Sequence, residues 1–310
     1  MTTAAVVSSF NPAEGLLDTC RAVREQVDVV VVVDDGSTKD VSAVLGQCRA
    51  AGYEVLELGV NRGIAHALNR GIERALTGGA DHVLTLDQDT VLSAGYLQRM
   101  FEHLALAQSL GLDRTILATS TINGEVAPFW HAERGLTLAF EPIQSGMLLP
   151  REVLEQVGLF EEELFIDCVE TEFYLRARAQ GVHFLITPGT DIEHGFGAPT
   201  TWVPPKPLRL VLGSGRGGFS FTEDAPFRHY YIARNRAIMY ARYWRAEPLW
   251  CMVSVAKDVL SRGRAMLFGT ERVARTYLTV RGFWGAARGE RGKIPDGVLR
   301  RAAVLSRSRS

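Results

Sequence analysis

The chain has few cysteines among its 310 residues and no long apolar run. Its four cysteines show no C-x-x-C spacing and no framework of a small disulfide-rich domain, so we expect buried thiols in a reducing cytoplasm. No apolar run approaches the roughly 18 residues that a spanning helix requires. Met1 is not followed by the basic segment of a signal peptide. We therefore expect a cytoplasmic protein that is soluble or peripheral.

Two glycine-rich nucleotide-binding motifs are also missing. No G-x-G-x-x-G follows the first apolar run, which argues against a dinucleotide oxidoreductase. No Gly-rich loop bearing Lys or Arg stands there either, which argues against a nucleotidyltransferase, although that class also uses metal-binding carboxylates on a related sheet. The stretch from Gly213 to Gly218 lacks the G-K-[ST] ending of a P-loop, so it is either a mobile loop or a linker.

Basic residues are scarce in the first two thirds of the chain and abundant in the last third. Residues 1–200 hold 13 Lys and Arg against 28 Asp and Glu, whereas residues 201–310 hold 21 against 7. A basic region can bind nucleic acid, anionic lipid or a phosphorylated substrate, and its sign alone does not choose among them. The charge does predict a functional division between residues 1–200 and 201–310.

Short apolar runs alternate with segments of helical spacing in residues 1–200. The apolar runs are Ala4 to Phe10, Val29 to Val33, Tyr53 to Leu58 and Val83 to Leu86. Such alternation predicts an α/β fold with a doubly wound, mostly parallel, Rossmann-like sheet and right-handed crossovers. Beyond residue 200 the spacing becomes helical, from Tyr230 to Trp244 and from Leu249 to Leu267, and we expect a helical C-terminal region with a frayed tail from Arg300.

The run at Val83 ends abruptly in Asp87-Gln88-Asp89. In open α/β sheets ligands bind at the carboxyl ends of the strands, where these carboxylates would emerge. Carboxylates at this spacing can hold Mg²⁺ or Mn²⁺ and leave coordination positions open for substrate phosphates. The alternative is a polar turn that caps the next helix.

A second acidic segment lies further along the chain. Asp167 precedes a predicted helix from Val169 to Ala179, whose first turn carries Glu170 and Glu172. Acidic residues near a helix N-terminus are routine, because the helix dipole favours them there. His194 follows a strand predicted at Val182 to Ile186, in an acidic loop, and is either a ligand or a solvated surface residue.

Several of these stretches occur together in one order. They are Asp34-Asp35-Gly36-Ser37, the N-x-G-I-A-x-A-x-N-x-G run from Asn61 to Gly71, Asp87-Gln88-Asp89, Ser145-Gly146, Phe165-Ile166-Asp167 with Glu170-Thr171-Glu172, and Glu193-His194. The series closely resembles family 2 inverting glycosyltransferases of the GT-A fold, and within them the bacterial rhamnosyltransferases, over roughly residues 4–245. The sequence departs from the usual pattern at Ser8-Ser9-Phe10-Asn11, where Thr-Tyr-Asn is usual, and at Glu170, where Asp is common.

The resemblance implies roles for the site residues. Asp34 would bind the base or ribose of a nucleotide-sugar, with Asp35 nearby. Asp87 and Asp89 would hold a divalent cation, Mg²⁺ or Mn²⁺, against the diphosphate, with His194 as the third protein ligand. Glu170 would be the general base, with Glu172 as its acidic neighbour. Glu172 and Asp167 are the rival candidates for the base. The remaining expected donor-binding residues are Ser8, Asn11, Asn61 and Gly63.

The function implied by the resemblance is transfer of a sugar, rhamnose from dTDP-rhamnose, to a glycan or polyprenyl-linked acceptor in cell-envelope polysaccharide synthesis. From their basic charge, residues 201–310 are expected to contact an anionic membrane surface, so that the protein is peripheral at the inner face of the cell membrane. The alternative is that this basic region packs on the acidic N-terminal domain. No nucleic-acid partner is expected. The alternatives are a nucleotidyltransferase and a catalytically silent module that binds a nucleotide-sugar or a lipid phosphate.

Overall fold

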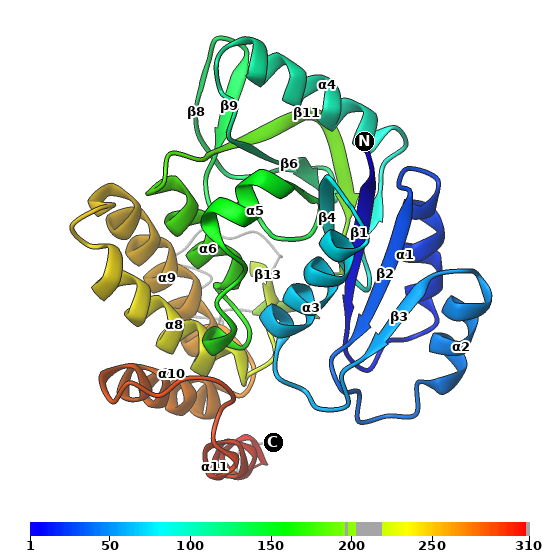
Figure 1. Cartoon of the computed structure of the whole chain (residues 1–310). Helices are drawn as coiled ribbons and strands as arrows, with labels where there is room; N and C mark the ends of the chain where they lie inside the picture. The colour runs from blue at the N-terminus through cyan, green and yellow to red at the C-terminus, as the bar shows by residue number, and fades with distance from the viewer. Residues whose placement is uncertain (196–197, 203–218, 308–310) are drawn as a thin grey trace. The chain divides into compact units, whose positions relative to one another are not determined.

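A computed structural model describes residues 1–195, 198–202 and 219–307 (Figure 1). The predicted glycine-rich loop or linker at Gly213 to Gly218 lies outside these residues. The chain divides into two compact units, Met1–Gly195 and Phe196–Ser310. No helix of the described segments is long and apolar enough to cross a membrane.

The first unit alternates strands and helices along most of its length. Its helices are α1 (Gly15–Arg24), α2 (Ser42–Ala50), α3 (Ile64–Thr77), α4 (Tyr96–Ser109), α5 (Arg151–Val157), the 3₁₀ turn η1 (Glu162–Leu164) and α6 (Val169–Arg178). Its strands are β1 (Thr3–Ser9), β2 (Val29–Asp34), β3 (Glu54–Glu57), β4 (His82–Asp87), β5 (Val91–Leu92), β6 (Thr115–Ile122), β7 (Glu125–Val126), β8 (Phe129–Glu133), β9 (Leu136–Ala139), β10 (Met147–Pro150) and β11 (His183–Glu193).

These strands form one sheet in the order β3-β2-β1-β4-β10-β6-β11-β9-β8, with β5 on β11 and β7 on β6. Strands β3, β2, β1 and β4 are parallel to one another, so their carboxyl ends meet at one edge. β6 and β11 are also parallel, and β10 runs antiparallel between β4 and β6. The predicted α/β fold with a mostly parallel central sheet is confirmed.

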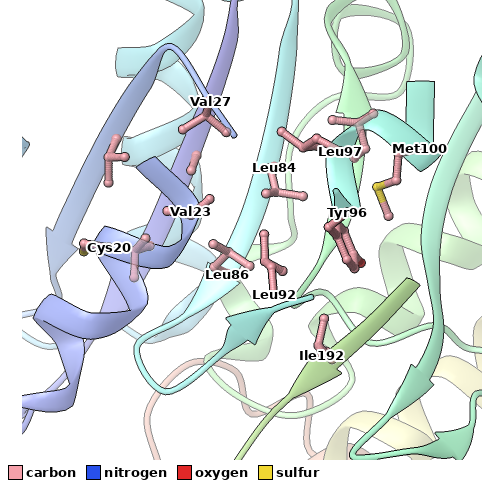
Figure 2. Close-up of a cluster of buried hydrophobic side chains, with 14 of the residues drawn as sticks. Cys20, Val23, Val27, Leu84, Leu86, Leu92, Tyr96, Leu97, Met100 and Ile192 are labelled. Atoms are coloured by element: carbon pink, nitrogen blue, oxygen red, sulfur yellow. The ribbon is translucent and has the colours of Figure 1, made fainter. Parts of the chain in front are cut away.

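Helices cover both faces of the sheet, because successive side chains of a strand point to opposite faces. Ala5 and Val7 of β1 belong to the buried cluster beneath α1, α2 and α4, part of which Figure 2 shows. Val6 points the other way, toward α3, where a Cβ on Gly71 would come within 2.3 Å of the Val6 Cγ1 atom. The glycine at position 71 therefore lets α3 lie close against the sheet.

Two features of the first unit differ from the sequence-based prediction. Residues 115–150, for which the sequence predicted no helix or strand, supply β6 to β10. β6, with the sequence TILATSTI, has no strict alternation of apolar and polar residues, and its neighbours β7 to β10 are too short to show a clear period. The strand expected at Val182 to Ile186 continues as β11 to Glu193, with an irregular register between Thr187 and Asp191. His194 is therefore the first residue after a strand.

The described residues of the second unit form a hairpin and four helices. The hairpin strands are β12 (Ala198–Trp202) and β13 (Phe219–Glu223), and the helices are α8 (Arg228–Tyr243), α9 (Pro248–Phe268), α10 (Arg272–Ala287) and α11 (Asp296–Arg307). The expectation of a frayed tail from Arg300 is wrong, because α11 continues to Arg307 and buries Val298 and Ala302.

A buried arginine organises the second unit. The Arg234 side chain is fully buried, stacks on the rings of Tyr230 and Tyr231, and donates a hydrogen bond to the Gly292 carbonyl oxygen at 2.6 Å. Tyr231 accepts a hydrogen bond from the Ile294 backbone N–H at 2.8 Å. The Tyr-Tyr-x-x-Arg sequence therefore ties α8 to the segment before α11.

Candidate functional site

A pocket of about 240 Å³ lies within the first unit, at the carboxyl edge of β1 and β4. The register of the sheet places Ser8 beside Asp87 there. The pocket is lined by Ser8, Ser9, Phe10, Asp35, Asn61, Gly63, Ile64, Ala67, Asp87, Gln88, Asp89, Phe165, Ile166 and His194.

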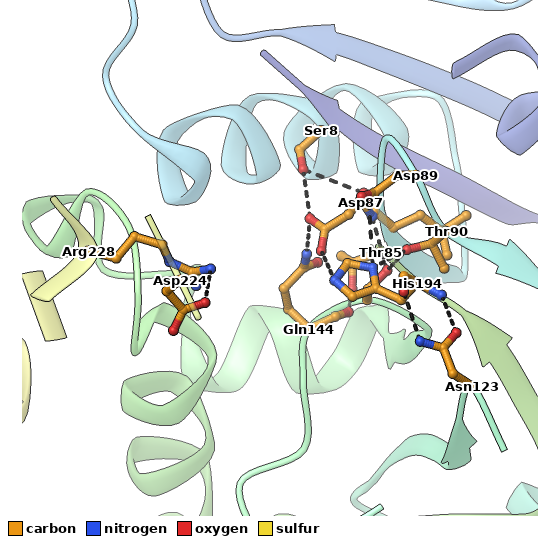
Figure 3. Close-up of polar contacts among 12 residues, drawn as sticks. Ser8, Thr85, Asp87, Asp89, Thr90, Asn123, Gln144, His194, Asp224 and Arg228 are labelled. Carbon is orange, nitrogen blue, oxygen red and sulfur yellow. Dashed lines mark hydrogen bonds and ion pairs between the residues drawn. The ribbon is translucent and has the colours of Figure 1, made fainter. Parts of the chain in front are cut away.

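Asp87 is the last residue of β4 and is held in place by its neighbours (Figure 3). Its Oδ1 atom accepts a hydrogen bond from Gln144 Nε2 at 2.5 Å and lies 3.5 Å from the Ser8 hydroxyl. Gln144 is itself anchored, because the Thr85 hydroxyl donates to the Gln144 backbone carbonyl at 2.5 Å. The Asp87 carboxylate is therefore pre-oriented, whereas the side chain of Asp89, 53% exposed, is open to a ligand.

His194 stands between the two aspartates. Its Nε2 atom lies 3.8 Å from Asp87 Oδ2, and its Nδ1 atom lies 3.5 Å from Asp89 Oδ1. The backbone of His194 is fixed by a reciprocal pair of 2.9 Å hydrogen bonds with the Asn123 side chain. β11 thus places the His194 imidazole beside the C-terminal end of β4.

A chain of hydroxyl groups runs behind the imidazole. Thr90 Oγ1 lies 2.9 Å from His194 Nδ1 and 2.7 Å from Ser145 Oγ. Ser145 Oγ in turn accepts a hydrogen bond from the Asp87 backbone N–H at 3.0 Å. With Nδ1 engaged by Thr90, the imidazole can turn Nε2 toward Asp87. This is the arrangement that orients histidine ligands in metal sites.

Asp35 holds the N-terminus of α3 against the pocket. Its buried carboxylate accepts hydrogen bonds from the backbone N–H groups of Arg62, at 3.0 Å, and Gly63, at 2.8 Å. Burial raises the pKa of Asp35, although the two backbone N–H groups and the nearby His66 hold it down in part. Because the carboxylate is occupied in this way, Asp35 shapes the loop that carries Asn61.

Asp34 and Asn11 have related roles in the neighbouring turn. The Asp34 carboxylate accepts hydrogen bonds from the hydroxyl and, at 3.0 Å, from the backbone N–H of Ser37. Asn11 Oδ1 accepts hydrogen bonds from the backbone N–H groups of Thr38 and Lys39, each at 2.9 Å. Neither residue lines the pocket, and both fix the turn beside it.

The loop before α6 has an unusual backbone. Phe165, Asp167 and Cys168 all have positive φ, between 63° and 68°, which residues with a side chain rarely adopt. Phe165 has ψ −65°, and the Ile166 N–H donates to the Leu164 carbonyl at 2.9 Å, so Phe165 is the centre of a classic-sense γ-turn, a rare and strained conformation. Such strain persists only where the surroundings enforce it, and it clusters at functional sites.

Gly63 provides part of that enforcement. A Cβ at position 63 would come within 2.2 Å of the Phe165 carbonyl oxygen, and the φ of Gly63 is +99°. A side chain at this position would therefore push the strained loop away. The glycine of the N-x-G pattern therefore lets the backbone at position 63 lie close to the backbone of Phe165 at the pocket wall.

A cluster of charged and polar side chains around Glu162 also holds the strained loop in place. Glu162 of η1 accepts hydrogen bonds from Asn69 Nδ2 at 3.0 Å and pairs with His66 Nδ1 at 2.8 Å and Arg70 at 3.3 Å. Burial would raise the pKa of Glu162, but the hydrogen bonds from Asn69 and His66 and the charges of His66 and Arg70 lower it below its usual value. α3 thus holds the loop at its start.

The three predicted catalytic carboxylates differ in their surroundings, and none is among the residues that line the pocket. Asp167 is buried within the strained loop, and Glu170 is half-buried in the first turn of α6. Glu172 is fully buried, and both of its oxygens are bound by Arg176 at 3.0–3.1 Å. Arg176 also donates to the Leu159 carbonyl at 2.7 Å, so this ion pair connects α6 to the segment before the loop.

Seven of the lining residues were predicted from the sequence as site residues. They are Ser8, Asp35, Asn61, Gly63, Asp87, Asp89 and His194. Sequence reasoning missed Gln144 as the partner of Asp87, Thr90 as the partner of His194, and the cluster around Glu162. Only Ser145-Gly146, next to Gln144 in the sequence, gave a signal for the first of these.

The donor set suits a hard divalent cation, because two carboxylates and an imidazole reach one pocket. In the described segments, however, no three His, Cys, Asp or Glu side chains are gathered closely enough to form a ready metal cluster. The half-exposed Asp89 can move toward a cation, while Asp87 and His194 are already positioned. The residues therefore fit Mg²⁺ or Mn²⁺ by their chemistry.

A parallel sheet with a D-x-D at its carboxyl edge defines the GT-A class, and solved structures share the fold. The S. aureus TarS 1-349 complex with UDP-GlcNAc superposes with a TM-score of 0.57 at 14% identity, covering 99% of this chain and 88% of that chain. TarS 1-349 alone gives 0.54 at 15% identity over the same shares. At these identities the likeness concerns the fold alone.

The chain belongs to glycosyl transferase family 2, whose family model matches residues 4–158. It is also similar to the dTDP-rhamnosyl transferase RfbF of Shigella flexneri, with 33% identity over 97 residues. That match covers 31% of this chain and only 28% of the relative. The predicted family is confirmed.

Proposed function

We propose that the protein is an inverting glycosyltransferase that moves a sugar from a nucleotide-sugar to a hydroxyl group of an acceptor. The observation that carries the proposal is the convergence of Asp87, Asp89 and His194 on one pocket of a family 2 domain. The pocket walls supply the rest of a donor site. Asn61 Oδ1 is buried there and has no hydrogen-bond partner among the described residues, so it can accept one from the base or ribose of the donor.

We propose dTDP-rhamnose as the donor. The support is the similarity to RfbF, which spans a third of the chain. Ser8, Asn61 and Gly63 would contact the nucleotide, with Asp35 holding the loop that carries the last two. Asp34 and Asn11 would act indirectly, through the turn that they fix.

Asp87, Asp89 and His194 would hold Mg²⁺ or Mn²⁺. When bound, such a cation neutralises the negative charge that builds on the departing diphosphate. Asp87 is kept in its orientation by Gln144 and Ser8. The Thr90 hydroxyl keeps the His194 ring in its orientation.

Glu170 is our proposed general base. The acceptor hydroxyl gives its proton to the carboxylate as its oxygen bonds to the anomeric carbon, the bond from that carbon to the diphosphate breaks, and the nucleoside diphosphate leaves. One displacement inverts the anomeric centre. Glu170 follows the strained Phe165 loop, whose Phe165 and Ile166 line the pocket, and it sits on the rigid start of α6.

We propose a glycan or polyprenyl-linked acceptor of cell-envelope polysaccharide synthesis, reached at the inner face of an anionic membrane. The support is the basic character of residues 201–310, in which Lys and Arg outnumber Asp and Glu by 21 to 7. Each Lys or Arg near such a surface contributes about 1 kcal/mol to binding.

The test is to incubate the purified protein with a panel of nucleotide-sugars, with and without Mg²⁺ or Mn²⁺, and to follow nucleoside diphosphate release. Asp89→Ala should abolish the metal-dependent part of nucleoside diphosphate binding in calorimetry, while Glu193→Gln, an exposed carboxylate outside the pocket lining, should leave it unchanged. Binding of a nucleotide-sugar without transfer to any acceptor would favour a silent binding module. Incorporation of a nucleotide from a triphosphate would favour a nucleotidyltransferase.

A further inference from the structure

Helix α9 has one packed face and one apolar face that is open. Its packed face buries Trp250, Cys251 and Ser254, and the Trp250 ring lies 5.6 Å from that of Tyr240 on α8. The exposed side chains on the other side are almost all apolar. They are Leu249, Met252, Val255, Ala256, Val259, Leu260 and Leu267. At 100° per residue they fill an arc of roughly 140°, opposite the packed face.

The apolar surface extends onto α10. Val273, Val280, Phe283 and Trp284 are exposed on that helix. The Phe283 ring lies 5.8 Å from the guanidinium carbon of Arg262 on α9, so the two helices meet there. Among the described residues, 11 of the 21 large exposed apolar side chains lie on these two helices, when Phe268 at the end of α9 is included. Figure 1 labels both helices. We call this exposed apolar region the α9–α10 surface. A concentration of exposed apolar side chains on neighbouring helices of a folded protein indicates an interaction site.

The charges beside the α9–α10 surface identify its partner. Lys257 and Arg264, both exposed, border the apolar arc of α9 along one edge. Trp284 is half exposed and Arg288 stacks on its ring at 4.8 Å. An apolar face with basic flanks and exposed tryptophan is typical of helices that lie in the plane of a membrane interface.

A second copy of the chain fits less well. In a two-fold symmetric dimer the same patch meets itself, so the like charges of the basic edge formed by Lys257 and Arg264 would be brought toward those of the second copy. Anionic headgroups neutralise that edge while acyl chains receive the apolar arc. α9, about 30 Å long, offers this contact along its whole length.

We infer that the α9–α10 surface docks the protein on an anionic lipid bilayer, with α9 lying in the interface. The inference deepens the proposed function. It rests on that function in one respect, because a lipid-linked acceptor is the reason why the protein would need a membrane. The apolar arc supplies affinity, and Lys257 and Arg264 supply the preference for anionic lipid.

The experiment is flotation of the full chain with vesicles of phosphatidylcholine alone or mixed with phosphatidylglycerol. The variant Val259→Ser/Leu260→Gln changes two side chains that are 66% and 74% exposed, so folding should survive. It should reduce the partition coefficient for the mixed vesicles by about tenfold or more, because it removes apolar area from the contact. The matched control Leu106→Gln/Val126→Ser removes exposed apolar side chains from the first unit and should float like the wild type.

A charge variant and a spectroscopic measurement complete the test. Lys257→Gln/Arg264→Gln should lose the preference for mixed over neutral vesicles. Bromolipids should quench wild-type tryptophan fluorescence, and Trp284→Phe should lessen the quenching. Failure of the wild type to float, or unchanged flotation of Val259→Ser/Leu260→Gln, would overturn the inference, as would a dimer that this variant converts to monomer. Calorimetry of nucleoside diphosphate binding on the same samples separates the two proposals, because donor binding does not involve this surface.

Discussion

Asn69 and Phe160 are joined by a reciprocal pair of hydrogen bonds across 91 residues of sequence. Asn69 Nδ2 donates to the Phe160 carbonyl at 2.9 Å, and the Phe160 N–H donates to Asn69 Oδ1 at 2.9 Å. The Asn69 side-chain amide thus satisfies the hydrogen-bonding needs of both the backbone N–H and the backbone carbonyl of buried Phe160, as a neighbouring strand would. The second Asn of the N-x-G-I-A-x-A-x-N-x-G run is therefore a clamp that fixes the segment leading to the strained loop at Phe165.

We expect Asn69→Ala to lower the free energy of unfolding by about 2–4 kcal/mol, because it leaves a buried N–H and a buried carbonyl without partners. Urea denaturation measures this change. The control Glu73→Ala, on an exposed part of the same helix, should change it by less than about 0.5 kcal/mol. Equal stability of the two variants would contradict the clamp.

Thr90 gives a prediction about the metal site. Thr90→Val removes the hydroxyl that engages His194 Nδ1 but keeps the size of the side chain. Loss of such a second contact typically weakens metal binding by about 10–100-fold, and calorimetry with Mn²⁺ should show a decrease in this range. Thr90→Ser keeps the hydroxyl and should bind Mn²⁺ like the wild type. ¹⁵N chemical shifts of the metal-free imidazole should show a tautomer change in Thr90→Val only.

Much of the core architecture was predictable because it depends on local patterns. The five valines from Val29 to Val33 predicted a strand buried on both faces, and all of them except Val29 are buried. The polar residues that end β1, β2 and β4 converge because the strands are parallel. The same logic located Asp87 and Asp89. It could not find β8 and β9, which are short and partly exposed and lack a clear apolar alternation.

Contacts between distant residues explain what could not be predicted in the site. Gln144 reaches Asp87 across 57 residues, and nothing in the sequence around Gln144 indicates a carboxylate partner. Asp34 and Asp35 are adjacent and chemically identical, yet only Asp35 lines the pocket, because alternation along the chain turns their side chains in different directions. Likewise, Glu172 is buried against Arg176 because of the way α6 packs. The acidic residues in the first turn of α6 do not predict this packing.

His229 makes the stability of the protein depend on pH. Burial, together with the charges of Arg275 and Arg262, lowers its pKa from 6.5 to about 4, although Asp224 and Glu223 oppose the shift. As the pH is lowered, His229 of the unfolded chain therefore binds a proton near pH 6.5, whereas His229 of the folded protein binds one only near pH 4. Stability is full above pH 6.5 and falls as the pH is lowered, by about 2 kcal/mol between pH 7.5 and pH 5.

Urea denaturation at both pH values measures that loss. Burial also lowers the pKa of His82 and His103, which contribute in the same direction. His229→Asn removes only one of these groups and keeps a polar side chain near the Thr279 hydroxyl, 3.3 Å from His229 Nδ1. The difference between pH 7.5 and pH 5 should therefore be smaller by about 2 kcal/mol in this variant, and an unchanged difference would contradict the assignment.

The carboxylates of α6 can be separated by measuring stability and rate together. Glu170→Gln keeps the size of the side chain but cannot accept a proton, so it should lower the rate of transfer by about 10²–10⁴-fold and leave stability and donor binding nearly unchanged. Glu172→Gln breaks a buried ion pair and leaves Arg176 without its charge partner, so it should lower the free energy of unfolding by about 3–5 kcal/mol.

Asp167→Asn needs testing in the same assay, because Asp167 is buried in the strained loop. If Glu170→Gln transfers sugar at a near-normal rate with saturating acceptor while a stable Asp167→Asn is inactive, the general base is Asp167. If only Glu172→Gln is inactive and it remains fully stable, the ion pair with Arg176 is dispensable for folding and Glu172 takes that role.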